Sequence, residues 1–311
     1  MGAYPYKFTK ILVIFVVRQT YFTMKLDGRR LSTNVDDRRG LGSAGTIGGL
    51  GLGGLIIVGL LTWLLGGDPT TVIQEAGSVL NGQVAEGYTP TPEEEELAVF
   101  AKQILAGTED VWTEIFRQNG LTYTPPKLVL FSGAVKSGCG GATSQSGPFY
   151  CSADQCVYLD LSFFTSMKKQ IGADGDFAYA YVIAHEVGHH VQNQLGTLGQ
   201  AHQQMARYKA NSKEYNQISV RLELQADFYA GVWAYHDNKM YNSLEAGDVE
   251  EGLAVAAKIG DDYLQKQAYG YTVPDSFNHG TSAQRSKWLK KGIATGDPSQ
   301  GDTFSIAYNS L

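Results

Sequence analysis

An uncharged apolar stretch constrains this chain more than any other feature of its sequence. Residues 47–65 read IGGLGLGGLIIVGLLTWLL and contain no Asp, Glu, Lys or Arg. A helix of about 20 apolar residues crosses the hydrocarbon core of a bilayer, and glycine is tolerated in such helices. The alternative is a buried core helix, but core helices are usually shorter and amphipathic. We therefore expect one N-terminal transmembrane helix over residues 47–65.

The charges that flank this stretch predict its orientation. The next Lys or Arg after residue 65 is Lys102, whereas five cationic residues precede the stretch, namely Lys25, Arg29, Arg30, Arg38 and Arg39. The positive-inside rule places the N-terminus in the cytoplasm and residues from about 66 onward outside it. The resulting division is a cytoplasmic segment (24–46), the span (47–65), a linker (66–91) and an extracytoplasmic domain (92–311). Residues 1–23 are predicted to be an upstream extension, because their apolar run is too short to span a bilayer.

Composition and patterning indicate an α+β domain after the span. The chain has 311 residues, of which 43% are hydrophobic and 18% charged, as in globular proteins. Its net charge of -6 gives no basic face, so no nucleic-acid partner is expected. Strand patterns at 126–133 and 156–164 flank a Gly/Ser-rich stretch, 134–155, that is predicted to be a loop. Helical patterns follow, which is the order expected of an α+β fold.

The most informative motif lies in one of these helical patterns. His185, Glu186 and His189 form H-E-x-x-H. On a helix the two histidines lie one turn apart on one face, where both imidazoles can bind one metal ion. Glu186 lies beside them and can hold a water molecule as a general base, as in metalloproteases. His190 lies about 100° round the helix and cannot join them. The alternatives are a solvated helix with incidental histidines and a closed structural zinc site, which usually contains cysteine.

A catalytic zinc ion needs a third protein ligand, and a second helical motif can supply it. The sequence RLELQADFYAGVWAY contains E-x-x-A-D, with Glu223 as the candidate ligand. Asp227 lies one turn further on and can accept a hydrogen bond from a ligating histidine. The alternative for this weaker motif is an ion pair within a helix. Because it follows H-E-x-x-H, we predict a zinc site of His185, His189 and Glu223, with Asp227 behind it.

The motifs occur together in an order that resembles a known family. The chain contains, in sequence order, MKLDGRRLSTNVDDRRG, YLDLSFF, HEVGHHVQ, ELQAD, GDD and PDSFNHGTSAQR. This series resembles the bacterial neutral zinc metallopeptidase family of YpfJ-type proteins. The resemblance implies a single-pass inner-membrane protein with a zincin-like metallopeptidase domain outside the cytoplasm. The resemblance does not indicate a substrate.

The same resemblance extends to the cysteines. Cys139 and Cys151 match a pair in the family, and outside the cytoplasm a disulfide between them is expected. Cys156 is peculiar to this chain and is expected to stay free and buried. Phe228 and Gly301 stand where the family often has cysteine, and both cysteines are missing together, as expected if they normally form a bridge.

We therefore expect a membrane-anchored zinc peptidase, most simply an endopeptidase acting on peptide or protein substrates. Zinc lowers the pKa of its water, and Glu186 takes the proton and later delivers it to the leaving amine. His279 and Arg285 are predicted to be catalytic, with His279 as the candidate donor to the developing oxyanion and Arg285 either orienting its loop or meeting the oxyanion itself. The alternative for His279 is a capping residue in a surface loop. The strand at 156–164 is predicted to align an extended peptide by edge pairing.

Two other functions fit the same motifs. A non-catalytic zinc-containing membrane module that binds partners would not need Glu186. A zinc amidase acting on cell-wall peptides would share all of the chemistry and differ only in the shape of its pocket.

Overall fold

The computed structural model describes residues 24–40, 88–173 and 175–311. These residues form an α+β fold, as predicted. The predicted span at 47–65, the extension 1–23 and all of the predicted linker before Tyr88 lie outside the described residues. Among the described residues, no helix combines the length and the apolar character needed to cross a bilayer.

A four-stranded sheet forms the base of the fold, in the order β1-β2-β6-β5. Its strands are β1 (Val35–Asp37), β2 (Lys127–Phe131), β6 (Cys156–Asp160) and β5 (Phe149–Cys151). The first three are parallel, and β5 runs antiparallel to β6 at one edge. Strands β2 and β6 are buried along nearly their whole length, which explains their continuous apolar sequences. The predicted strand at 126–133 is thus confirmed as β2.

The Gly/Ser-rich stretch at 134–155 was wrongly predicted to be a loop. It contains the hairpin of β3 (Ala134–Ser137) and β4 (Gly140–Thr143), followed by the edge strand β5. Cys139 is bonded to Cys151, which confirms the predicted disulfide and ties the hairpin to β5. Cys156 is free and buried, also as predicted.

The second predicted strand needs two corrections. It covers only residues 156–160, because Asp160 accepts a hydrogen bond from the Ser162 backbone N–H and helix α4 (Ser162–Ile171) begins there. Strand β6 also lies between β2 and β5, so it has no free edge with which to align a peptide. Within the described sheet, β5 is the edge strand on that side.

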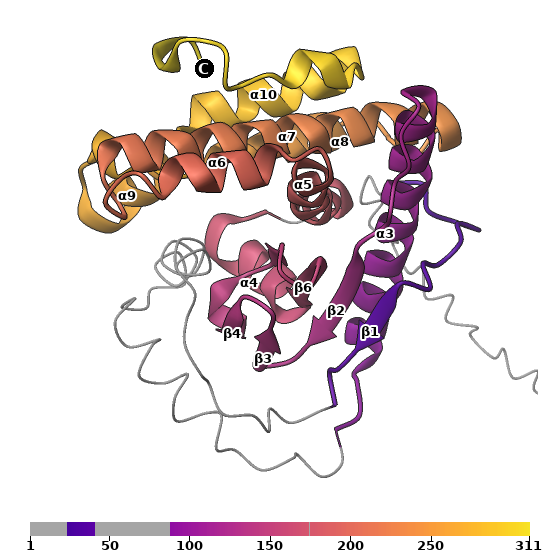
Figure 1. Cartoon of the computed structure of the whole chain (residues 1–311). Coiled ribbons are helices and arrows are strands. Elements are labelled where there is room, and N and C mark those ends of the chain that lie inside the picture. Colours follow the sequence, from indigo (N-terminus) through magenta and orange to yellow (C-terminus); the bar gives the residue numbers. More distant parts are fainter. Residues whose placement is uncertain (1–23, 41–87, 174) are drawn as a thin grey trace, which may run out of the picture.

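The helices are arranged around one central helix, α5 (Asp176–Gln194), which is buried from Phe177 to Gln192. Figure 1 shows α5 between the sheet and a layer made of α6, α7, α8 and α10, with α3 beside the sheet. The other helices are α3 (Pro92–Gln118), α6 (Thr197–Met205), α7 (Lys213–Tyr241), α8 (Asp248–Lys258), α9 (Asp261–Tyr269) and α10 (Ser282–Thr295). Short 3-10 helices lie at Ser144–Ser146, Pro274–Ser276, Pro298–Gly301 and Tyr308–Ser310.

Residues 24–40 belong to the same folded body as the helices and the sheet. Strand β1 pairs with β2, and the chain on either side of β1 continues the hydrogen bonding, with Leu128 donating to Asn34 and Arg38 donating to Leu130. At the other end, the Lys25 backbone N–H donates to the Ser243 carbonyl over 2.8 Å. The predicted division into a separate cytoplasmic segment and an outer domain is therefore wrong for residues 24–40. Hydrogen-bonded strands lie on one side of a membrane, not on two.

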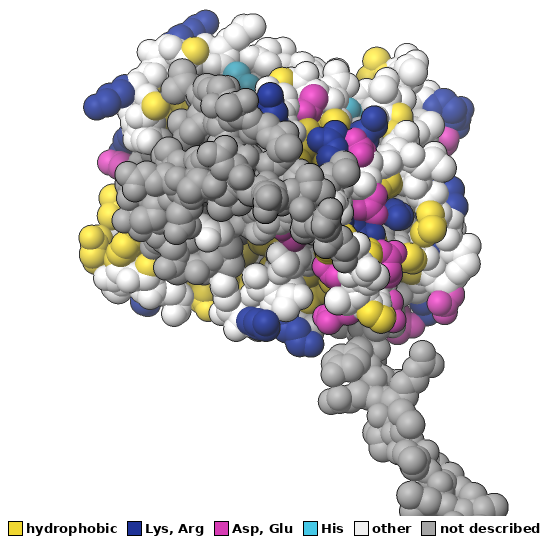
Figure 2. All heavy atoms as spheres, turned by 90° about the horizontal axis from the view of Figure 1, so that it is seen from below, with side chains coloured by type: hydrophobic (Ala, Val, Ile, Leu, Met, Phe, Trp, Pro, Cys, Tyr) yellow, Lys and Arg dark blue, Asp and Glu magenta, His cyan; other side chains and the backbone are white. Residues whose placement is uncertain are grey.

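The five cations that carried the orientation prediction have partners within this body. Figure 2 shows basic and acidic side chains close together on the face seen from below. The pairs are Lys25–Glu245, Arg29–Asp237, Arg30 with Glu109 and Asp110, Arg38–Asp36, and Arg39 with Asp37 and Glu95. These charges bind neighbouring carboxylates, so their number before residue 47 no longer indicates which side of a membrane they occupy.

Residues 24–40 and 88–311 also meet where the undescribed segment begins and ends. A Cβ atom placed on Gly40 would lie 3.3 Å from Cδ1 of Tyr88. Gly40 and Tyr88 are therefore neighbours in the folded body.

We predict that the Arg29–Asp237 pair is a major contribution to stability. The two side chains are 9% and 1% exposed and form two hydrogen bonds, so Arg29→Met would leave a buried carboxylate unpaired. Such losses cost about 3 to 5 kcal/mol. The matched control is Arg38→Met, which breaks a half-exposed pair and should cost less than about 1 kcal/mol. Urea unfolding of the two variants measures the difference, and equal losses would contradict the assignment.

Candidate metal centre

Helices α5 and α7 cross at very short range, and this crossing builds the site. At the crossing point, a Cβ atom on Gly188 would lie 2.9 Å from the Ala226 carbonyl oxygen and 3.1 Å from its Cα. Only glycine fits this gap without displacing backbone. Gly188 lies between the two histidines of H-E-x-x-H, and Ala226 lies between Glu223 and Asp227. The crossing therefore brings the two predicted motifs face to face.

The three predicted ligands meet at this crossing. His185, His189 and Glu223 are all buried, and one donor atom from each lies within 4.8 Å of the others. Nε2 of His185 is 3.2 Å from one carboxylate oxygen of Glu223, and Nε2 of His189 is 3.5 Å from the other. Both imidazoles thus direct the same nitrogen toward one carboxylate.

The tautomer of each histidine follows from the partner of its other nitrogen. Nδ1 of His185 is 2.8 Å from Asp227 Oδ1, so Nδ1 carries the proton. Nδ1 of His189 is 2.9 Å from Gln192 Oε1. The Gln192 amide nitrogen donates to the Leu222 carbonyl and to Gln225, which fixes its oxygen toward His189. Nε2 is therefore the atom of each imidazole that would bind a metal ion, with loss of the Nε2 proton from His185 when the metal binds.

Asp227 is itself held by two further side chains. Arg285 donates to both of its carboxylate oxygens over 2.9 Å, and the Tyr181 hydroxyl donates to it over 2.6 Å. Arg285 also donates to Tyr181 and to the Ile259 carbonyl. Through these contacts Arg285 positions Asp227, and the catalytic role predicted for Arg285 stays a prediction.

Glu186 has the environment of a general base rather than of a ligand. Its Oε2 is buried without a hydrogen-bond partner among the described residues. Burial raises the pKa of this carboxyl to about 7, against an opposing effect of His185. A carboxyl with a pKa near neutrality can both accept and return a proton.

The electrostatics of the crossing fit a cation. Burial lowers the pKa of His189 to about 4, which keeps its imidazole neutral. Burial also lowers the pKa of His185, but Asp227 and Glu223 outweigh it and raise the value to about 10. Burial opposes ionisation of Glu223, yet His189 and His279 lower its pKa. The carboxylate of Glu223 thus stabilises positive charge here, and two imidazoles with one carboxylate are a donor set that suits zinc.

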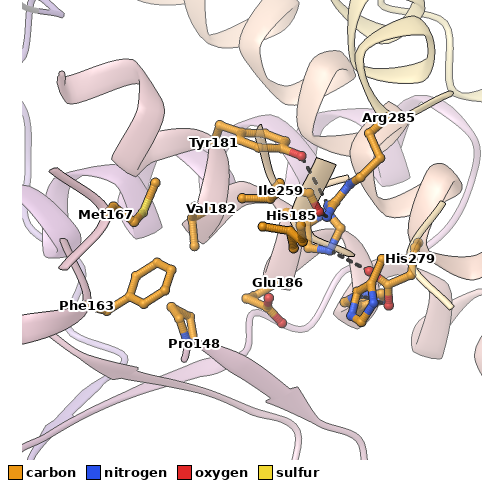
Figure 3. Close-up of a pocket in the computed structure, with 13 residues that line it drawn as sticks. Pro148, Phe163, Met167, Tyr181, Val182, His185, Glu186, Ile259, His279 and Arg285 are labelled. Carbon is orange, nitrogen blue, oxygen red and sulfur yellow. Dashed lines mark hydrogen bonds and ion pairs between the residues drawn. The ribbon is translucent and has the colours of Figure 1, made fainter. Parts of the chain in front are cut away.

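His279 lines the same cavity as the three predicted ligands. It lines the cavity with Tyr181 and Arg285, and Figure 3 shows it across Glu186 from Phe163. The fully buried Asp261 carboxylate accepts from the His279 backbone N–H over 2.7 Å and lies 3.6 Å from Nδ1. Burial lowers the pKa of His279, but Glu223 and Asp261 outweigh it and raise the value. The imidazole of His279 is buried and lines the cavity, which is not a surface-loop position.

His190 is excluded from the centre, as predicted. Its Nδ1 is 3.0 Å from the Tyr150 hydroxyl, and its Nε2 is 2.7 Å from the Thr124 carbonyl. It joins α5 to the edge of the sheet instead.

The family described as "Putative neutral zinc metallopeptidase" matches residues 24–304. The chain belongs to this family. It is 46% identical over 297 residues to "Uncharacterized protein YpfJ" of Escherichia coli (strain K12), covering 90% of this chain and 99% of that protein. It is also 42% identical over 260 residues to "Uncharacterized protein Rv2575" of Mycobacterium tuberculosis (strain ATCC 25618 / H37Rv), covering 78% and 85%. No solved structure matches the chain.

Membership of the metallopeptidase family supports zinc as the cofactor and hydrolysis as the reaction class. The structure also bears on the two missing cysteines, because a Cβ atom on Gly301 would lie 2.5 Å from the ring of Phe228. These two positions are adjacent in space, and the aromatic ring fills the volume beside the glycine.

Sequence reasoning missed three residues that shape this centre. Gln192 could have been found, because it lies three residues after His189 on the same helix face. Tyr181 lies one turn before His185 and gave the same kind of signal. Asp261 belongs to the GDD motif, but its contact with His279 depends on how α9 and the following loop pack.

We predict that Gln192 is needed for tight zinc binding. Gln192→Leu removes the acceptor that fixes the His189 tautomer, so zinc affinity should fall by about 10- to 100-fold. Gln194→Leu is the matched control, because Gln194 contacts His190 and Thr124 rather than a ligand. Competition against a chelator measures both affinities. An unchanged affinity in Gln192→Leu would contradict the tautomer assignment.

We also predict that Gly188 sets the distance between the two ligand helices. In Gly188→Ala the methyl group would displace α7, at a cost of about 1 to 3 kcal/mol. Zinc affinity should fall by about tenfold or more as Glu223 moves away. The control is Gly199→Ala in α6, where a Cβ meets nothing within 4 Å. This control should keep its zinc affinity, and an equal loss in both variants would show that the crossing is unimportant.

Proposed function

We propose that this protein is a zinc-dependent peptidase, most simply an endopeptidase, with a zincin-like catalytic domain. One observation carries the proposal. A buried carboxylate with an unpartnered oxygen, Glu186, adjoins two imidazoles whose Nε2 atoms both face a second carboxylate, that of Glu223. A closed structural site would have no use for this free oxygen.

His185, His189 and Glu223 would hold the metal ion. When bound, zinc would lower the pKa of a water molecule and polarise the scissile carbonyl. Glu186 removes the proton from the attacking water and delivers it to the amine nitrogen as the peptide bond breaks. Asp227 and Gln192 keep both imidazoles in the tautomer that binds metal, and Arg285 keeps Asp227 ionised and in place.

His279 supplies the donor for the developing oxyanion. Against the effect of burial, Glu223 and Asp261 raise the pKa of His279, which favours the protonated donor form, and Asp261 lies 3.6 Å from its Nδ1. A donor of this kind contributes about 3 to 4 kcal/mol to catalysis.

The edge strand β5 supports an extended peptide as the substrate. Its Tyr150 backbone N–H bonds to the Glu186 carboxylate, so the strand passes directly beside the base. Sheet edges bind extended peptides through main-chain hydrogen bonds. This mode of binding needs no free chain terminus, as expected of an endopeptidase. This role replaces the one predicted for residues 156–164.

We further propose that the catalytic domain lies outside the cytoplasm, and that residues 47–65 attach it to the inner membrane without a single crossing, because both flanks of this stretch lie on one side. The Cys139–Cys151 disulfide supports this location, because disulfides persist in oxidising compartments. The pairing of β1 with β2 then requires residues 24–40 to lie on the same side as the active site.

Two substitutions test the chemistry. Glu186→Gln should bind zinc normally and lose peptide hydrolysis, because the base is not a ligand. His279→Ala should also bind zinc normally, yet lose about a hundredfold or more in kcat/KM. Zinc content and digestion of an unbiased peptide library measure both. Full activity in Glu186→Gln would contradict the mechanism and would favour a non-catalytic binding module.

One labelling experiment tests the location. Asp27 and Lys209 are both exposed, one in each part of the folded body. Asp27→Cys and Lys209→Cys should both react with a membrane-impermeant maleimide added outside the inner membrane. Protection of both cysteines would contradict the location outside the cytoplasm but not the same-side arrangement. Labelling of one and protection of the other would contradict the same-side arrangement.

A further inference from the structure

The cavity at the metal centre has two chemically different halves. Figure 3 shows Phe163, Met167 and Pro148 on one side of Glu186, and His279 on the other. Val182 lies with the first group. These four residues, here called the apolar wall, are Pro148, Phe163, Met167 and Val182.

The apolar wall is built from three elements that are already fixed in the fold. Phe163 and Met167 lie one turn apart on α4, and Val182 lies on α5 one turn before Glu186. Pro148 directly precedes the edge strand β5. The side chains of Phe163, Met167 and Val182 are only 6%, 2% and 9% exposed, so most of each is packed into the core. The wall is therefore a preformed surface and not a mobile one.

The charged groups that line the cavity all belong to the metal centre or its supporting residues. Among the described residues, the charged or titratable groups of the cavity lining other than Tyr181 are His185, Glu186, His189, Glu223, His279 and Arg285. None of them belongs to the apolar wall, and Arg285 is already paired with Asp227. A charged substrate side chain against the wall would lose its water without gaining a partner. An apolar side chain would instead gain from leaving water.

We propose that the apolar wall selects the substrate, by accepting a bulky apolar side chain such as Leu, Met or Phe on a residue next to the cleaved bond. This inference rests on the proposed peptidase function. It follows from the position of the wall beside Glu186. The base must lie next to the cleaved bond, so the side chain of a substrate residue flanking that bond can reach the wall. Asp, Glu and Lys are rejected at that position.

Matched peptides test this selection. In a series that differs only in one residue flanking the cleaved bond, kcat/KM for Leu or Phe should exceed that for Asp or Lys by about tenfold or more. Met167→Ala should raise kcat/KM for Trp relative to kcat/KM for Leu by about tenfold, because the smaller side chain leaves more space at the wall. Met205→Ala is the control, since it removes the same side chain from a buried position in α6 that does not line the cavity. Ratios within one preparation do not depend on how much of a variant is folded.

A binding measurement separates this inference from the proposed function. Peptide hydroxamates that differ only in a Leu or an Asp side chain are titrated into the zinc-loaded protein, without any need for turnover. Tighter binding of the Leu compound supports the wall, and equal or reversed affinities overturn it. Cleavage of the peptide series without apolar preference overturns the wall but leaves the peptidase function intact. Failure to cleave any peptide overturns the proposed function alone. Failure to bind zinc overturns both the proposed function and the selection by the wall.

Discussion

The close crossing of α5 and α7 is the constraint on which the rest of the site depends. A side chain at Gly188 would meet the backbone of Ala226, so the two helices touch at a distance that only glycine permits. A second close contact follows between α7 and α10, where Cβ atoms on Gly231 and Gly292 would each lie 2.9 Å from the other's Cα. The first contact brings Glu223 to the histidines. The second brings α10, and with it Arg285, to Asp227.

Hydrogen bonds behind the ligands orient them at this crossing. The buried polar groups behind the ligands form a connected network, from Arg285 through Asp227 to His185, and from Gln192 to His189. Networks of this kind are costly when partly satisfied, since each unpaired buried group loses its hydration. Glu186 Oε2 lacks a partner in the described structure, and burial raises the pKa of this carboxyl. Perturbed pKa values of this kind cluster at functional sites.

The sequence predicted the ligands because their spacing is local. His185 and His189 share a helix face, and Glu223 and Asp227 share another, so one helical period gave all four. Prediction from the sequence failed where interacting residues are distant along the chain. Arg29 lies 208 residues from Asp237, and charge counting therefore assigned Arg29 to membrane orientation. Strands β3 and β4 were missed because they are short and Gly-rich, so that pairing rather than propensity forms them. The order of strands in the sheet, which decides that β5 is the edge, is likewise a tertiary property.

The proposed activity depends on one metal ion held by side chains from two crossing helices. Anomalous diffraction at the zinc edge, from crystals of the zinc-loaded protein, tests this claim most directly. We expect a single strong peak about 2.0 to 2.2 Å from Nε2 of His185, Nε2 of His189 and a carboxylate oxygen of Glu223. Glu186 should lie outside bonding distance of the peak. A peak elsewhere, or one whose bonded atoms include Glu186 in place of Glu223, would contradict the account.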